Sequence, residues 1–176
     1  AGAVTIAIPE MDIRVDAGGR VSLRIVDRYS RARSLVEELM IAANHAAARF
    51  LAEREVPGVY RSQPEPRQRL VKKEEAPGTL FQNWVQRKML PRVVLDRRPE
   101  RHAGLGVDMY ATATSPIRKY LDLITQRQIR AALGLGRAYT EGEVDELLQR
   151  LGPLLAQVGR IQQGRQRYWI LKYLEG

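Results

Sequence analysis

Two adjacent cations, Arg118 and Lys119, lie where the sequence predicts the start of a helix. Ser115 is a favoured N-cap residue, and Pro116 suits the first helical position because its missing N–H has no hydrogen bond to lose there. We therefore predict a helix over residues 115–133. Positive charges are unfavourable in the first turn of a helix, whose dipole attracts anions instead. A bound phosphate would remove this conflict, so the free backbone N–H groups and the Arg118 guanidinium predict a phosphate-binding site.

A structural explanation for Arg118 stays open beside the phosphate site. Asp122 lies four residues further along the chain. In a helix its carboxylate could pair with the guanidinium along one face, and the charge of Arg118 would then need no ligand. The residue types alone do not decide between a phosphate site and this ion pair.

The stretch around these residues resembles the second half of the catalytic domain of the ribonuclease II/ribonuclease R family of hydrolytic exoribonucleases. The positions that match the family's pattern are His102, Gly104-Leu105-Gly106, Tyr110, Thr114 through Tyr120 and Asp122-Leu123. The resemblance implies that Arg118 is the catalytic arginine. It also implies RNA-binding roles for Tyr110, Thr114, Ser115 and Lys119.

A second match to this family lies in the strongest predicted helix, over residues 34–55. Ser34 and Glu37 have the spacing of a capping box, and residues 34–44 are similar to a family helix that holds a pair of glutamates. The resemblance implies that Glu37 contacts the nucleotide near the 3′ end and that Glu38 also binds RNA. The alternatives are that Glu37 only caps the helix and that Glu38 is an ordinary exposed helix residue.

The net charge of +9 is unevenly placed along the chain. Residues 1–60 hold 8 basic and 8 acidic side chains, whereas residues 61–176 hold 21 basic and 12 acidic ones. The excess therefore lies entirely in the part that carries Arg118. This placement favours a polyanion partner, with nucleic acid the leading candidate. A solubilising arginine-rich surface without such a partner is the alternative.

The end of the chain places Arg165 and Arg167 beside two aromatic residues, Tyr168 and Trp169. Cations interleaved with aromatic side chains suit a channel for single-stranded nucleic acid. They equally suit a last helix that packs through Trp169 and keeps its arginines in water. The family's catalytic domain ends in an arginine-rich helix with a tryptophan at a similar place, so both arginines are predicted to bind RNA. Here Gln162-Gln163-Gly164 replaces the family's Ala-Glu-Arg-type run before it.

The same resemblance implies catalysis with Mg²⁺ held by a cluster of closely spaced aspartates. That cluster belongs to the first half of the family's catalytic domain, and nothing in this sequence resembles it. The acidic residues here are scattered, and two isolated histidines with no cysteine argue against a zinc site. We therefore expect no metal ligands in this chain, and we expect the Mg²⁺ ligands in a half of the domain that is missing from it.

The periodicity of the chain predicts an α+β fold. The expected strands are 4–8, 11–15 and 20–26. A Gly18-Gly19 turn joins the last two into a hairpin, which needs a larger sheet for its stability. The further expected helices are 81–90, 140–158 and 161–174. Pro153 predicts a kink or break in the second of these. The family resemblance implies that this fold is part of an RNB-type catalytic domain, with the hairpin in a larger sheet packed by several long helices.

The resemblance implies one half of a Mg²⁺-dependent 3′→5′ exoribonuclease that degrades single-stranded RNA to nucleoside 5′-monophosphates. Residues 1–176 would be the C-terminal half of the catalytic domain, without its aspartate cluster and its oligonucleotide-binding barrels. The expected partners are single-stranded RNA and the missing N-terminal half. Without that half we expect exposed apolar helix faces and no activity. A non-catalytic RNA-binding scaffold and a basic helical domain for protein partners are the alternatives.

The location of the protein is predicted from what its sequence lacks. The chain contains no run of about 18 apolar residues and does not open with a cationic and then apolar leader. We therefore expect no membrane partner and a cytoplasmic location.

Overall fold

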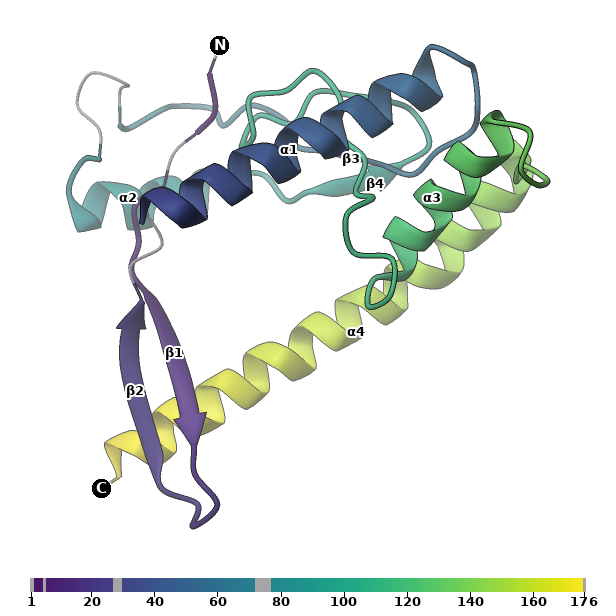
Figure 1. The fold of residues 1–176 in the computed structure, drawn as a ribbon. Helices are drawn as coiled ribbons and strands as arrows, with labels where there is room; N and C mark the ends of the chain where they lie inside the picture. Colours follow the sequence, from purple (N-terminus) through teal and green to yellow (C-terminus); the bar gives the residue numbers. More distant parts are fainter. Residues whose placement is uncertain (1, 5, 27–29, 72–76, 176) are drawn as a thin grey trace. The chain divides into compact units, whose positions relative to one another are not determined.

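A computed structural model describes residues 2–4, 6–26, 30–71 and 77–175 (Figure 1). Its helices and strands are, in chain order, β1 (Glu10–Val15), β2 (Val21–Val26), α1 (Arg31–Ala52), β3 (Tyr60–Ser62), α2 (Leu80–Met89), β4 (Val94–Asp96), α3 (Tyr120–Ala132) and α4 (Glu141–Leu174). This mixture of helices and strands confirms the predicted α+β class. The chain forms two compact units. The first comprises residues 1–8 and 35–148, and the second comprises residues 9–34 and 149–176.

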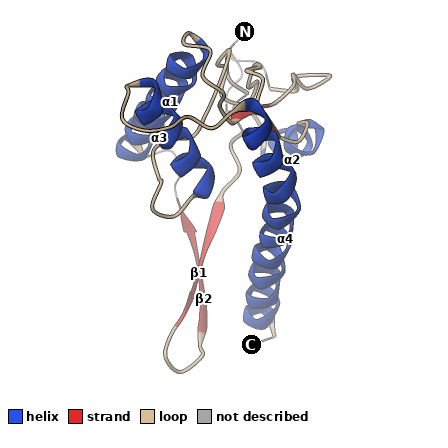
Figure 2. Ribbon diagram, turned by 90° about the vertical axis from the view of Figure 1, so that its right-hand side faces the viewer, coloured by secondary structure: helices blue, strands red, loops and turns tan. Residues whose placement is uncertain are grey.

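The predicted hairpin is present in the second unit. β1 and β2 pair antiparallel, with Val15 opposite Val21 at the turn, and the two strands cross in the view of Figure 2. The Asp16 carboxylate closes the turn by accepting hydrogen bonds from the backbone N–H groups of Gly18 and Arg20, each at 2.9 Å. Gly19 has a φ of 79°, which a residue with a side chain rarely adopts.

The sheets that the described residues form are small. β1 pairs with β2, and β3 pairs with β4, so within the described ranges each sheet has two strands and the hairpin joins no larger one. The strand predicted over residues 4–8 is wrong where the structure describes that range, because these residues form no ladder; Thr5 lies outside the described residues.

Helix α1 begins earlier than predicted. It starts at Arg31, and the Ser34 N–H donates to the Ser30 carbonyl at 3.0 Å. Ser34 therefore lies inside the first turn, and the predicted capping box with Glu37 is wrong. The buried residues of α1 are Asn44, Ala48 and Leu51, all in its second half.

Four apolar residues of the first half of α1 are exposed. These are Leu35, Val36, Leu39 and Met40, which we call the α1 apolar face; their exposed fractions lie between 44% and 61%. The prediction that the chain leaves an apolar helix face exposed is therefore confirmed.

Helix α2 agrees closely with its predicted range, and its buried side chains are amides. Trp84 is 48% exposed, with the Lys88 ammonium 3.7 Å from its ring centre. Asn83 and Gln86 are buried instead. The Asn83 side-chain oxygen accepts from the Ala7 N–H at 2.7 Å. Amide side chains occupy these positions because the neighbouring loops have backbone groups that need partners.

The same pattern extends through the interior. Among the described residues, ten polar side chains are buried, nearly as many as the apolar ones. The apolar cluster contains Ala48, Tyr60 and Ala111, with Met109 packed against it. Because this apolar cluster is small, buried side-chain hydrogen bonds hold the loops in place.

Helix α4 is a single helix through both ranges that we predicted separately. Its start is as expected, because Thr140 and Glu143 form a capping box: the Glu143 N–H donates to the Thr140 Oγ1 at 3.2 Å and the Thr140 N–H to the Glu143 carboxylate at 2.8 Å. Of the kink or break predicted at Pro153, the break is wrong, because the helix continues through this residue. No helix within the described residues is long and apolar enough to cross a membrane.

Candidate functional site

The candidate site is built on the irregular segment 102–119 of the first unit. The segment begins with a tight turn in which the His102 N–H donates to the Val107 carbonyl at 2.9 Å. Gly106 has a φ of 73°, and a Cβ there would lie 2.5 Å from the backbone nitrogen of Ala3. This turn therefore requires glycine at 106, both for its backbone angle and for its space.

Two helices hold the segment through the backbone N–H and C=O groups of one residue, Ala113. The Asn44 side-chain oxygen, from α1, accepts from the Ala113 N–H at 2.8 Å. The Gln126 side-chain nitrogen, from α3, donates to the Ala113 carbonyl at 2.7 Å. Asn44 also donates to the Tyr110 hydroxyl at 2.9 Å. The backbone before Ser115 is thereby fixed relative to both helices.

The predicted helix start at Ser115 is wrong. α3 begins at Tyr120, and its N-cap Lys119 has extended backbone angles of φ −128° and ψ 114°. These angles separate α3 from a short turn in which the Ser115 carbonyl accepts from the N–H groups of Arg118, at 3.3 Å, and Lys119, at 3.0 Å. Ser115 therefore begins a turn of its own, which we call the 115–119 turn.

The ion pair between Arg118 and Asp122 is absent from the part of the chain that the structure describes. Asp122 is fully buried, and its Oδ2 accepts from the Ser115 N–H at 3.3 Å. Arg118 is exposed, and its guanidinium donates to the Ser115 hydroxyl at 3.3 Å. The structural explanation for Arg118 is therefore wrong, and its charge stays available to an anion.

The rest of the 115–119 turn is also open to solvent. Lys119 and the preceding Thr114 are exposed, Ser115 is half-buried, and Ile117 is fully exposed. Two cations and one apolar side chain thus share a short surface whose backbone is tied to the interior through Asp122.

Tyr110 faces inward. Its ring is buried and lies edge-on to the His102 ring, with the ring centres 5.7 Å apart. The backbone carbonyl of Tyr110 accepts from the Arg61 N–H at 2.8 Å. Burial, and next the charge of Arg61, lower the pKa of His102 below its usual 6.5. His102 is therefore neutral at pH 7. In this structure Tyr110 serves the packing of the segment.

The two glutamates of the family helix lie elsewhere on the same unit. Glu37 and Glu38 are exposed on the first half of α1, and no contact joins either of them to Arg118 among the described residues. His45, for which a structural role fits best, contacts Asp108 at 2.6 Å. This hydrogen bond lowers the pKa of Asp108. The pair fastens α1 to the segment at a second point.

The predicted cations of the chain end lie in the second unit. Arg165 and Arg167 are exposed on α4. Sequence reasoning missed the roles of Asn44, Gln126 and Asp122. A signal existed only for Asn44, which is a polar residue on an otherwise apolar helix face.

A metal site is not found in the described part of the chain. There, no group of three or more His, Cys, Asp or Glu side chains is close enough together to hold an ion. Mg²⁺ needs oxygen ligands such as carboxylates, and the described acidic residues do not supply such a set.

Comparisons with known proteins identify relatives of this chain. A model of the RNB domain family matches residues 1–134. An uncharacterized ribonuclease of Synechocystis sp. is 39% identical over 178 residues, which cover 98% of this chain and 26% of that protein. The mitochondrial exoribonuclease II of Schizosaccharomyces pombe is 31% identical over 170 residues, which cover 88% of this chain and 18% of that protein.

The fold has a solved counterpart. An active-site mutant of the Dss1 exoribonuclease from Candida glabrata superimposes with a TM-score of 0.85 at 22% identity, over 98% of this chain and 24% of that one. The chain thus spans about a quarter or less of the length of these proteins.

Proposed function

The chain belongs to the RNB domain family, and on that premise we propose that it forms the C-terminal half of the catalytic domain of a 3′→5′ exoribonuclease. The complete protein would hydrolyse single-stranded RNA, with Mg²⁺, to nucleoside 5′-monophosphates. The exoribonuclease names of the relatives support the reaction class. The direction, the metal and the products come from the family resemblance.

The observation that carries this proposal is the state of Arg118. Its guanidinium is exposed and has no carboxylate partner within the described residues, while the turn beneath it is tied to buried Asp122. Phosphodiester hydrolysis develops negative charge on phosphate oxygens, and a fixed cationic donor aimed at them stabilises the transition state. We assign this catalytic role to Arg118.

The neighbouring residues would hold the RNA. The Lys119 ammonium and the hydroxyls of Thr114 and Ser115 are suited to phosphate and ribose oxygens. Tyr110 would act indirectly, by holding the segment through Asn44. Glu37, Glu38, Arg165 and Arg167 stay predicted RNA contacts, supported by the resemblance.

Metal ions belong to another part of the proposed domain. The described residues do not fit a Mg²⁺ site, so we assign the ligands to the missing half and derive no step of the reaction through the ion. This chain's own contribution is to position phosphate and to stabilise its charge. By itself the chain should therefore be inactive. A cytoplasmic location stays a prediction, since a relative is named as mitochondrial.

A labelled-RNA assay tests the reaction. The complete protein is incubated with Mg²⁺ and a single-stranded RNA that carries its label at the 5′ end. We expect labelled products that shorten stepwise from the 3′ end, with nucleoside 5′-monophosphates released. RNA that is bound and left uncut would instead support the non-catalytic scaffold.

Replacing Arg118 tests its role in the same assay. We expect Arg118→Ala to lower the turnover rate by roughly 100- to 1,000-fold, as the loss of one transition-state donor does. The matched control is Arg130→Ala, which removes an exposed arginine from α3 and should leave the rate unchanged. An Arg118→Ala enzyme with the wild-type rate would overturn the catalytic assignment.

A further inference from the structure

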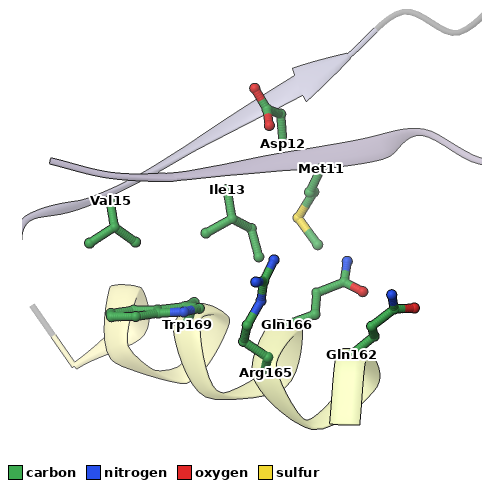
Figure 3. Close-up of a pocket in the computed structure, with 8 residues that line it drawn as sticks. All are labelled: Met11, Asp12, Ile13, Val15, Gln162, Arg165, Gln166 and Trp169. Atoms are coloured by element: carbon green, nitrogen blue, oxygen red, sulfur yellow. The ribbon is translucent and has the colours of Figure 1, made fainter. Parts of the chain in front are cut away.

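The second unit contains a groove between β1 and the last turns of α4 (Figure 3). Because side chains alternate along a strand, Met11, Ile13 and Val15 all point toward the helix, whereas Asp12 points away from it. Asp12 instead pairs with the Arg14 guanidinium at 3.0 Å. The strand therefore supplies an apolar wall.

The helix supplies a wall of different chemistry. Gln162, Arg165, Gln166 and Trp169 follow each other at helical spacing, so they share one face of α4 and line the groove together. Figure 3 shows the Trp169 ring below Val15 and the Arg165 guanidinium reaching toward Ile13. The groove has a volume of about 520 Å³. That size lies within the roughly 300–1,000 Å³ of sites for small molecules.

The Trp169 ring has an aromatic neighbour and stays partly accessible. It lies edge-on to the Tyr168 ring, with the ring centres 5.0 Å apart and an angle of 74° between the planes. Trp169 is half-buried, whereas Tyr168 is 58% exposed and does not line the groove. An indole opposite an aliphatic wall forms a slot suited to a flat aromatic ring.

The charge of the unit indicates the class of molecule that carries such a ring. The second unit contains 11 basic and 5 acidic residues, and so holds +6 of the chain's net charge of +9. This excess attracts a polyanion. Nucleic acid combines flat rings with repeated negative charge, and glutamine amides can bond to the edges of bases.

We propose that the groove binds one nucleotide of single-stranded RNA, with its base stacked on Trp169 and its phosphate beside Arg165. Gln162 and Gln166 would contact the base edge. Base stacking on an aromatic residue tolerates every sequence, so the groove would hold RNA without selecting a base. The choice of RNA as the nucleic acid rests on the proposed function.

Photo-crosslinking tests the groove in the complete protein. Single-stranded RNA that contains 5-iodouridine is bound, irradiated, and mapped by mass spectrometry after trypsin digestion. We expect a crosslink in the peptide 168–172, because trypsin cleaves after Arg167 and Lys172. Trp169→Leu should abolish this crosslink. Trp84→Leu, which removes the exposed tryptophan of the other unit, should retain it.

Affinity measurements separate stacking from charge. We expect Trp169→Leu to raise the Kd for single-stranded RNA about 5- to 150-fold, whereas Trp169→Phe keeps most of the affinity because it keeps an aromatic face. Trp169→Leu should leave the salt dependence of binding unchanged. Arg165→Gln should reduce the slope of log affinity against log salt by about 0.7, the value for one phosphate of a single strand.

The outcomes distinguish this inference from the proposed function. If the protein shortens RNA but gives no crosslink in 168–172, the groove does not bind RNA and another segment of the protein covers it. If the crosslink forms but RNA is not shortened, the groove assignment holds and the exoribonuclease assignment fails. If RNA is neither bound nor shortened, both fail.

Discussion

Asn44 shows how one buried residue can position a segment that is distant in sequence. An amide carries both a donor and an acceptor, so a single side chain satisfies the Tyr110 hydroxyl and the Ala113 N–H. Gln128 does the same on α3, where it donates to the Tyr139 carbonyl at 3.1 Å and accepts from the Tyr139 N–H at 2.7 Å. An apolar residue at position 44 would leave the buried Ala113 N–H without this partner, and one at position 128 would leave the partly buried Tyr139 backbone groups without theirs.

We therefore expect Asn44→Leu to destabilise the chain more than Tyr110→Phe. The first change leaves the buried Ala113 N–H without a hydrogen-bond acceptor, which costs about 1–3 kcal/mol. The second change removes one ordinary hydrogen bond, worth about 0.5–1.5 kcal/mol. The free energy of unfolding in urea measures both. Equal losses of unfolding free energy, or a larger loss for Tyr110→Phe, would contradict the conclusion that Asn44 anchors the backbone of Ala113.

At the scale of elements, a helix begins directly after a residue whose backbone angles are not helical. Thr79 is extended, with φ −77° and ψ 157°, and its side chain accepts from the Gln82 N–H in a full capping box. Ser34 has the same spacing to Glu37, but the chain is already helical three residues before it. The spacing of a capping box therefore indicates a helix start only where the preceding residues are not helical.

These two hydroxyl residues make a matched test. We expect Thr79→Ala to lower the free energy of unfolding by about 0.5–2 kcal/mol, the usual cost of a lost N-cap. Ser34→Ala should change it by less than about 0.5 kcal/mol, as for surface substitutions without a special role. Thermal or urea unfolding of the two variants measures the contrast. A comparable loss in Ser34→Ala would mean that α1 is capped at Ser34 after all.

At the scale of the whole molecule, the α1 apolar face indicates a surface that another part of the protein covers. Leu35, Val36, Leu39 and Met40 lie within two turns of one helix, and a stable domain rarely leaves such a face in water. Our proposal assigns its cover to the missing half of the catalytic domain, because the chain spans only about a quarter of its relatives.

Leu39→Asp tests that assignment by comparing two lengths of protein. In residues 1–176 alone the side chain is 61% exposed, so we expect a change of less than about 0.5 kcal/mol in the free energy of unfolding. In the complete protein the substitution would bury a charge in place of a leucine. There we expect the free energy of unfolding to fall by more than about 2 kcal/mol. Small effects in both proteins would contradict the proposed cover.

The sequence by itself determined the features that depend on neighbouring residues. These include the Gly18-Gly19 turn of the hairpin, the range of α2 and the start of α4 near residue 140. The motif around Arg118 also placed the chain in its family, because the order and spacing of its residues are sufficient for that match.

Only the tertiary structure decided how Arg118 is presented. Its turn is separated from α3 and is anchored through Asp122, while Asn44 fixes the preceding peptide. The Asn44 contacts join residues 66 and 69 positions apart, and no local pattern specifies such pairs. The extended backbone of Lys119 separates residues 115–118 from α3, and the Asp122 carboxylate accepts from the Ser115 N–H, so that within the described residues the Arg118 guanidinium has no carboxylate partner.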